Sequence, residues 1–114
     1  METILQRLLE IEGVTGALLA GKDGLVVAST LDGEEEEFLG AMAAACYDAT
    51  TRYIGQLGMG EVRHFIFETP GGTIQMSDAG DLLLVVRSNS YASVGRIRVE
   101  CAHASVRLAE RIGS

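Results

Sequence analysis

The sequence predicts an α/β (α+β) fold: a three-layer α/β/α sandwich with a five-stranded antiparallel sheet at its centre. The apolar pattern gives the order helix, hairpin, helix, three-stranded meander, helix. Short links within both groups of strands favour antiparallel pairing. The last strand, residues 82–86, is apolar at every position, which is typical of a strand covered on both faces. We therefore expect one long helix on one face of the sheet and two helices on the other.

The N-terminal segment predicts a short helix followed by a β-hairpin. Apolar residues recur with helical spacing across residues 3–11, where Thr3 is the expected N-cap. Two apolar runs, residues 14–20 and 25–30, flank the segment Gly-Lys-Asp-Gly at 21–24. An Asp-Gly pair between apolar runs favours a hairpin, because the turn needs a positive φ that glycine adopts easily.

Residues 34–57 predict the long helix, with Asp32 as its N-cap and acidic residues suited to the positive end of the helix dipole. The helix carries small residues on more than one side. A stripe expected to be buried comprises Phe38, Met42, Ala45, Ala49 and Tyr53, and a second, offset stripe comprises Leu39, Ala43, Cys46, Thr50 and Ile54. A helix that is smooth on two faces suits close approach to a second surface, most simply a copy of the same chain.

The meander is predicted at residues 62–68, 73–78 and 82–86, and the last helix at 93–112. In its first strand we expect one side to carry Val62, His64 and Ile66, and the other to carry Arg63, Phe65 and Phe67. This strand comes first in the meander, so it can lie at the sheet edge, where an unpaired backbone invites another strand. Pairing with a copy would satisfy that edge. The alternative is that Arg63 and Glu68 guard it alone.

Composition limits the class of protein. The chain has 114 residues, of which 47% are hydrophobic, so we expect one domain (residues 1–114) with its own core. A net charge of −7 argues against binding to nucleic acid or to an anionic membrane surface. No apolar run is long enough to span a membrane. Two isolated cysteines fit a reducing compartment, which predicts a cytoplasmic protein.

The sequence offers no cluster typical of a catalytic, metal or cofactor site. His64 and His103 have no nucleophile pattern nearby, and Cys46 and Cys101 lack the spacing of zinc ligands, so both cysteines are expected to be small buried residues. Residues 21–24 lack the upstream glycine and the Ser/Thr of a phosphate-binding loop, and they lead into a strand. We therefore expect no cofactor, no metal and no enzymatic activity.

Charged residues mark the start of the long helix, where four glutamates run from residue 34 to residue 37. The run is either a solvated helix start or a docking patch for a basic partner. Tyr47 on the same helix is either a further contact or a cover for a dimer seam. The residues predicted to bind a partner are Glu35, Glu36, Asp48, Thr51 and Arg52. On the last helix, we expect four arginines to face water or to pair with Glu100 and Glu110: Arg96, Arg98, Arg107 and Arg111.

Two segments resemble a known family when they are taken together. They are Gly-Val-Thr-Gly-Ala-Leu-Leu at 13–19 and Lys-Asp-Gly-Leu-Val-Val-Ala-Ser at 22–29. The alanine-rich helix and Gly-Asp-Leu-Leu-Leu-Val-Val at 80–86 follow them. With these motifs, nearly the whole chain resembles the roadblock/dynein light chain family, in particular its small bacterial MglB-like members. The resemblance implies a profilin-like sandwich, in agreement with the order of elements.

The resemblance also implies a function: a non-catalytic homodimer that binds and regulates a small Ras-like GTPase of the MglA type, in some members as its GTPase-activating partner. In the family, the third strands of two subunits pair and their long helices pack side by side. On this sequence the implied dimer interface comprises Val62, His64, Phe65, Ile66 and Phe67 of the strand and Ala43, Ala44, Tyr47 and Thr50 of the helix. The alternative is a small-molecule-sensing or generic scaffold domain of the profilin-like class.

Overall fold

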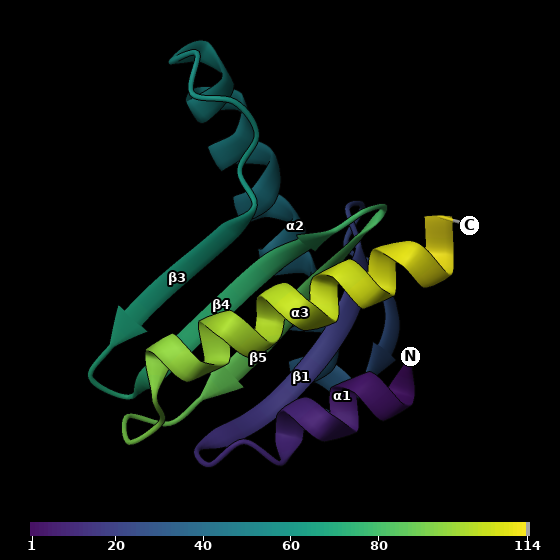
Figure 1. Ribbon diagram of the computed structural model, residues 1–114, viewed down its shortest axis with the longest axis vertical. Coiled ribbons are helices and arrows are strands. Elements are labelled where there is room, and N and C mark those ends of the chain that lie inside the picture. The colour runs from purple at the N-terminus through teal and green to yellow at the C-terminus, as the bar shows by residue number, and fades with distance from the viewer. Residues whose placement is uncertain (114) are drawn as a thin grey trace.

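In the computed structural model, which describes residues 1–113, one five-stranded sheet separates two layers of helices (Figure 1). The elements are, in chain order, α1 (Glu2–Leu9), β1 (Val14–Gly21), β2 (Val26–Ser29), α2 (Gly33–Gln56), β3 (His64–Thr69), β4 (Gly72–Ala79), β5 (Leu82–Ser88) and α3 (Val94–Gly113). The strands lie in the order β2-β1-β5-β4-β3, and every neighbouring pair is antiparallel. The predicted fold is confirmed, and β3 lies at one edge of the sheet.

The two faces of the sheet carry separate hydrophobic cores. α1 and α3 lie side by side over one face and contribute Leu5 and Leu108 to its core, whereas α2 covers the other face (Figure 1). In β5, Leu84 belongs to the α1–α3 core and the next residue, Val85, belongs to the α2 core. Both side chains are fully buried. The continuous apolar run in β5 therefore reflects helices on both faces, as predicted.

α2 lies directly against the β1–β2 hairpin because two glycines leave room for the contact. Gly24 in the turn has a φ of 93°, which glycine adopts without strain. A Cβ atom on Gly40 of α2 would lie 2.8 Å from Val26 Cγ2 and 3.0 Å from the Gly24 carbonyl oxygen. This contact fixes the direction of α2. The helix contacts mainly β1, β2 and β5, and its C-terminal end runs past the sheet (Figure 1).

Three local details differ from the predictions. α1 begins at Glu2 with Met1 as its N-cap, so Thr3 lies inside the first turn. Asp32 is the N-cap residue of α2 as predicted, but its side chain makes no capping hydrogen bond. Val62 precedes β3 and packs against the α2 core, so it does not share a face with His64. The strand alternation begins only at His64 and does not extend back to residue 62.

Candidate interaction surface

β3 leaves one edge of the sheet unpaired among the described residues, because it pairs only with β4. Phe65 points toward α2 and is buried in that core. Ile66 and Phe67 are 38% and 39% exposed. No proline or lysine interrupts the strand. An open edge with partly exposed apolar side chains is a surface that a second strand can extend.

The α2 stripe that the sequence predicts to be buried faces solvent instead. Phe38, Ala45, Ala49 and Tyr53 are exposed, and only Met42 packs against the core. One helix lying on a sheet buries a single stripe, and the contact of Gly40 with the hairpin decides which stripe it is. Helical geometry places the exposed stripe on the flank opposite Gly40 and the hairpin. Because β2 and β3 are opposite edges of the sheet, this flank faces the β3 edge.

The C-terminal end of α2 and the loop after it stand clear of the sheet (Figure 1). Three large apolar residues in this projecting end, Tyr53, Leu57 and Met59, are 69%, 68% and 73% exposed. The sequence pattern predicts no interaction role for Leu57 and Met59. One signal could have found them, because they lie in a glycine-rich segment, 55–60, outside any periodic apolar run. Apolar side chains left together in solvent typically mark an interaction site.

A small polar network holds α2 at the point where it leaves the sheet. Lys22 Nζ lies 3.2 Å from Asp78 Oδ1 and 4.7 Å from the centroid of the Tyr47 ring. The Tyr47 hydroxyl donates to Asp78 Oδ2 at 3.3 Å. Partial burial lowers the pKa of Lys22, but its interactions with Tyr47 and Asp78 outweigh burial, so the pKa lies above its ordinary value. Tyr47 therefore ties its own helix to the hairpin and to β4.

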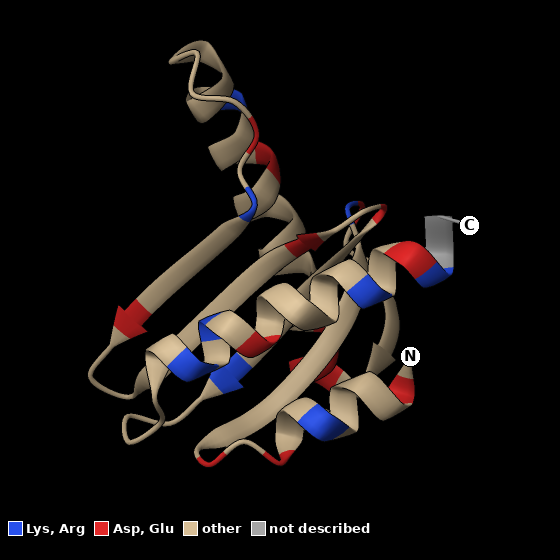
Figure 2. Ribbon diagram, viewed as in Figure 1, with Lys and Arg blue, Asp and Glu red and all other residues tan. Residues whose placement is uncertain are grey.

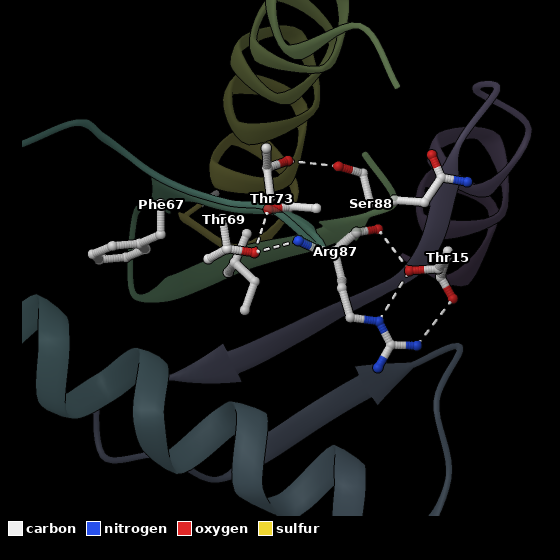
Figure 3. A pocket seen from close by; sticks show the side chains of 10 residues that line it. Thr15, Phe67, Thr69, Thr73, Arg87 and Ser88 are labelled. Carbon is white, nitrogen blue, oxygen red and sulfur yellow. Dashed lines mark hydrogen bonds between the residues drawn. The ribbon is translucent and has the colours of Figure 1, made fainter. Parts of the chain in front are cut away.

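A cavity of about 480 Å³ opens over the ends of β3 and β4, on the face that α2 leaves partly uncovered (Figure 3). Phe67 and Ile74 give it an apolar wall. At the other side, Arg87 Nε donates to Thr15 Oγ1 at 3.0 Å, and the Arg87 guanidinium forms an ion pair with Glu35 of α2. The charge of Arg87 is thus already paired within the chain. The cavity therefore presents mainly apolar surface to a binding partner.

His64, on the α3 side of β3, is hydrogen-bonded to two side chains of the neighbouring strand β4. Its Nε2 lies 2.7 Å from Gln75 Oε1, and its Nδ1 lies 2.7 Å from Ser77 Oγ. The Gln75 amide nitrogen donates to the Val94 carbonyl oxygen at 3.0 Å, so Gln75 Oε1 accepts a hydrogen bond from the imidazole Nε2–H. Burial lowers the pKa of His64, and the charge of Arg98 acts in the same direction, whereas the Gln75 hydrogen bond opposes both. The arrangement suits a neutral, structural histidine.

Of the four helix residues expected at a dimer interface, two are buried and two are half-buried. Ala43 is buried in the α2 core, and Ala44 is buried where α2 meets the hairpin turn at Gly24. Tyr47 and Thr50 are half-buried. Since Ala43 and Ala44 are buried and Tyr47 contacts Lys22 and Asp78 of the same chain, the exposed surface of α2 is formed mainly by the exposed stripe.

The polar α2 residues expected to bind a partner form two separate groups. Glu35, which is bound to Arg87, and Glu36 lie near the start of α2. Asp48, Thr51 and Arg52 lie about 20 Å further along the helix axis. There, Arg52 Nη2 donates to Asp48 Oδ2 at 2.9 Å, and the Thr51 hydroxyl donates to the Tyr47 carbonyl oxygen at 2.7 Å. The structure therefore does not bring the five residues into one patch.

Other chemistry is limited in the described part of the chain. Residues 1–113 contain no group of three His, Cys, Asp or Glu side chains placed to hold a metal ion. No helix in this part has the length and apolar character needed to cross a membrane. Cys101 lies on the buried side of α3, and burial raises the pKa of its thiol to about 12. Cys101 is therefore a small buried residue as predicted, while Cys46 is only half-buried.

Comparison with known sequences decides the family. The sequence profile of the Roadblock/LC7 domain family matches residues 1–88. The chain belongs to the Roadblock/LC7 domain family. It is also 36% identical over 109 residues to the uncharacterized protein MJ1340 of Methanocaldococcus jannaschii, an alignment that covers 95% of this chain and 96% of that protein. The resemblance inferred from the sequence is confirmed.

Solved structures show the same fold in other roadblock domains. A Roadblock/LC7 domain from Streptomyces avermitilis aligns over 100% of this chain and 98% of its own length, with a TM-score of 0.92 and 22% identity. Myxococcus xanthus MglB aligns over 97% of this chain and 93% of its own, with a TM-score of 0.89 and 20% identity. LokiProfilin2, solved in complex with rabbit actin, aligns over 96% and 95% at a TM-score of 0.58 and 16% identity. The profilin-like architecture is thereby confirmed.

Proposed function

We propose that the protein is a cytoplasmic, non-catalytic homodimer that binds and regulates a small Ras-like GTPase. The observation that supports the dimer is that three surfaces left without a partner lie at one border of the molecule. The free edge of β3, the exposed stripe of α2 and the projecting end of α2 all lie there. A second copy related by a two-fold axis would cover all three at once, because each copy presents the same border to the other.

The cavity of Figure 3 gives the projecting end a place to bind. The α2 end lies beside the start of β3, whereas the cavity lies beside the end of β3 and the following turn. If the two β3 strands pair antiparallel, the start of one strand meets the end of the other. The projecting end of each copy then reaches the cavity of its partner. Tyr53 and Leu57 would be buried against the partner's Phe67 and the partner's Ile74, which supports an interface formed by exchange of apolar surface.

A light-scattering experiment tests the dimer. We expect the wild-type chain to have the mass of two subunits at micromolar concentration. Leu57→Asp in the projecting end should weaken the dimer at least tenfold, because it places a charge in an apolar cavity. Leu25→Asp is the matched control: Leu25 is 71% exposed and lies in the hairpin, away from β3. A monomeric wild-type chain, or equal losses in the two variants, would contradict the proposed dimer.

The GTPase role rests on the family and on the surface that the dimer would present. Pairing at β3 would place two α2 helices side by side, with their exposed polar residues facing away from both sheets. The Asp48–Arg52 pair is 64% and 73% exposed in its side chains and can exchange its internal hydrogen bond for one to a partner. Structural likeness to MglB supports the same reading. This chain then contributes a binding platform, and the nucleotide chemistry stays with the GTPase.

The GTPase role is tested separately from the dimer. Purified Ras-like GTPases of the source organism, loaded with GDP or a non-hydrolysable GTP analogue, are captured on immobilised wild-type chain. We expect one of them to bind with a preference for one nucleotide state. Arg52→Glu should weaken GTPase binding while the dimer persists. Arg96→Glu on α3 should leave GTPase binding unchanged. If no GTPase binds in either state, the regulatory role is wrong even where the dimer is real.

A small-molecule-sensing role is the second candidate, since the 480 Å³ cavity is large enough for a small ligand. Its position favours a protein partner instead. The cavity opens at the rim of the sheet rather than between helix and sheet, and its arginine is already paired with Glu35. Native mass spectrometry of the purified chain distinguishes the two, because a retained small molecule would favour sensing.

A further inference from the structure

A second groove lies on the opposite face of the sheet, between α1 and α3. This α1–α3 groove has a volume of about 470 Å³, and its lining includes Arg7 from α1 and both Arg107 and Arg111 from α3. A smaller hollow of about 40 Å³ continues it along α1 and shares Ile4, Arg7 and Arg107. Three guanidinium groups from opposite ends of the chain therefore face one groove.

The arginines of the groove are not neutralised by neighbouring carboxylates. Among the side chains that the structure describes, no carboxylate oxygen lies within 4.0 Å of Arg7, Arg107 or Arg111; the three ion pairs of this part of the chain lie elsewhere. Glu100 and Glu110 line the two hollows but do not reach the guanidinium groups. Of the two alternatives expected for the α3 arginines, exposure to water is confirmed, and no ion pair with Glu100 or Glu110 is present among the described side chains. The groove keeps an excess of positive charge.

This charge is unusual for the molecule as a whole. The chain carries a net charge of −7 and has only nine Lys and Arg residues. Five of the nine lie on the two helices of this face: Arg7, Arg96, Arg98, Arg107 and Arg111. Figure 2 shows basic residues along both α1 and α3. Like charges gathered in one groove repel one another, so a bound anion would relieve a cost that the free protein bears.

We propose that the α1–α3 groove binds a small phosphorylated molecule. A guanidinium group presents planar pairs of N–H donors that match the oxygens of a phosphate group, and several of them can share one phosphate. Arg7 and Arg107 line both hollows, so they are the central pair, and Arg111 with the Thr3 hydroxyl adds donors at the outer end. The buried side chains of Ile4 and Leu8 form an apolar floor, which strengthens the attraction between the charges.

The size of the ligand follows from the charge of the rest of the protein. A volume of about 470 Å³ lies in the range of small-molecule sites. An extended polyanion, such as nucleic acid or an anionic membrane, would meet the remaining acidic surface of a chain with a net charge of −7. A compact phosphate-bearing ligand meets only the groove. The site lies across the sheet from the proposed dimer border, so neither proposal depends on the other.

Isothermal titration calorimetry with inorganic pyrophosphate, at low ionic strength, tests the groove. We expect the wild-type chain to bind one pyrophosphate per subunit. Arg7→Gln and Arg107→Gln should each raise the dissociation constant about tenfold, since each removes a charge-assisted hydrogen bond to phosphate. Arg96→Gln is the matched control: it removes the same charge from an exposed position on the same helix, outside the groove lining. This control should keep the wild-type affinity.

Two further measurements make the result unambiguous. Far-ultraviolet circular dichroism checks that each variant is folded, which is expected because all the substituted arginines are exposed. Sedimentation with vesicles containing phosphatidic acid separates a free ligand from a lipid headgroup. The proposal is overturned by three outcomes: no heat of binding at millimolar pyrophosphate, an equal loss in Arg96→Gln and Arg107→Gln, or binding to vesicles without binding to pyrophosphate. The Leu57→Asp variant should bind pyrophosphate as the wild-type chain does.

Discussion

Gly40 provides a direct test of how closely α2 packs on the hairpin. In an exposed helix interior, a Gly→Ala substitution stabilises by about 1 kcal/mol. At Gly40 the new Cβ atom would lie 2.8 Å from Val26 Cγ2 and 3.0 Å from the Gly24 carbonyl oxygen. The Gly24 contact is with a backbone atom, and hydrogen bonds that join Gly21 to Gly24 and Leu25 hold this turn, so it cannot retreat as a flexible side chain could. Overpacking of this kind typically costs 1–3 kcal/mol. We expect Gly40→Ala to lower the free energy of unfolding by about 1 kcal/mol, with the two effects combined.

The matched control is Gly95→Ala in the first turn of α3, where a Cβ atom would meet no atom within 4 Å. This variant should gain about 0.5 kcal/mol from helix propensity alone. Urea denaturation followed by circular dichroism, at one protein concentration, measures both changes. The changes in the free energy of unfolding of the two variants should have opposite signs. If Gly40→Ala stabilises the protein as much as Gly95→Ala, the helix–hairpin contact is loose and does not set the direction of α2.

Three other predictions concern groups inside the protomer. Lys22→Met should lower the free energy of unfolding by about 0.5–1 kcal/mol in the same assay, because it leaves Asp78 without its cation at a site that water partly screens. The wild-type chain should lose stability relative to His64→Gln as the pH falls below 6.5: the folded-state pKa of His64 is lowered, so in that window the unfolded chain binds more protons. A chemical denaturation series at stepped pH checks this, and parallel curves would contradict it. A thiol reagent should label Cys46 in the native protein and Cys101 only after unfolding. The reason is that Cys101 is fully buried and its thiol has a pKa of about 12. Mass spectrometry of partly labelled protein locates the labelled sites.

Most of the fold could be predicted because local chemistry determines it. Asp23-Gly24 between two apolar runs indicates a turn, and the positive φ of Gly24 confirms the reason. The stripe of α2 could not be assigned in the same way. Small residues occur on both sides of the helix, so periodicity alone does not say which side is buried. The contact of Gly40 with the hairpin decides it, and that contact joins segments that no spacing rule connects.

The candidate site also has a part that the sequence predicts and a part that depends on long-range contacts. Short links make β3, β4 and β5 a meander, so β3 is one of its two outer strands and its apolar side chains could be named from the sequence. The non-local pairing of β1 with β5 is what leaves β3 at the edge. The cavity and the α1–α3 groove could not be predicted from the sequence. Thr15 and Arg87 are 72 residues apart, and Arg7 and Arg107 come from opposite ends of the chain. Such pairs meet only after the sheet has formed, and the sequence marks each member as an ordinary polar residue.

The unequal covering of the sheet explains why the proposed dimer is preferred to a generic scaffold. α1 and α3 together cover most of their face, where His64 of β3 is hydrogen-bonded to Gln75 and Ser77 of β4. α2 covers only part of the other face and then leaves it, so the open strand edge, the exposed stripe, the projecting end and the cavity all gather at that border. An unrelated partner would have to match four features of different shape. A second copy carries a complement to each of them, because the projecting end and the cavity that receives it belong to the same chain.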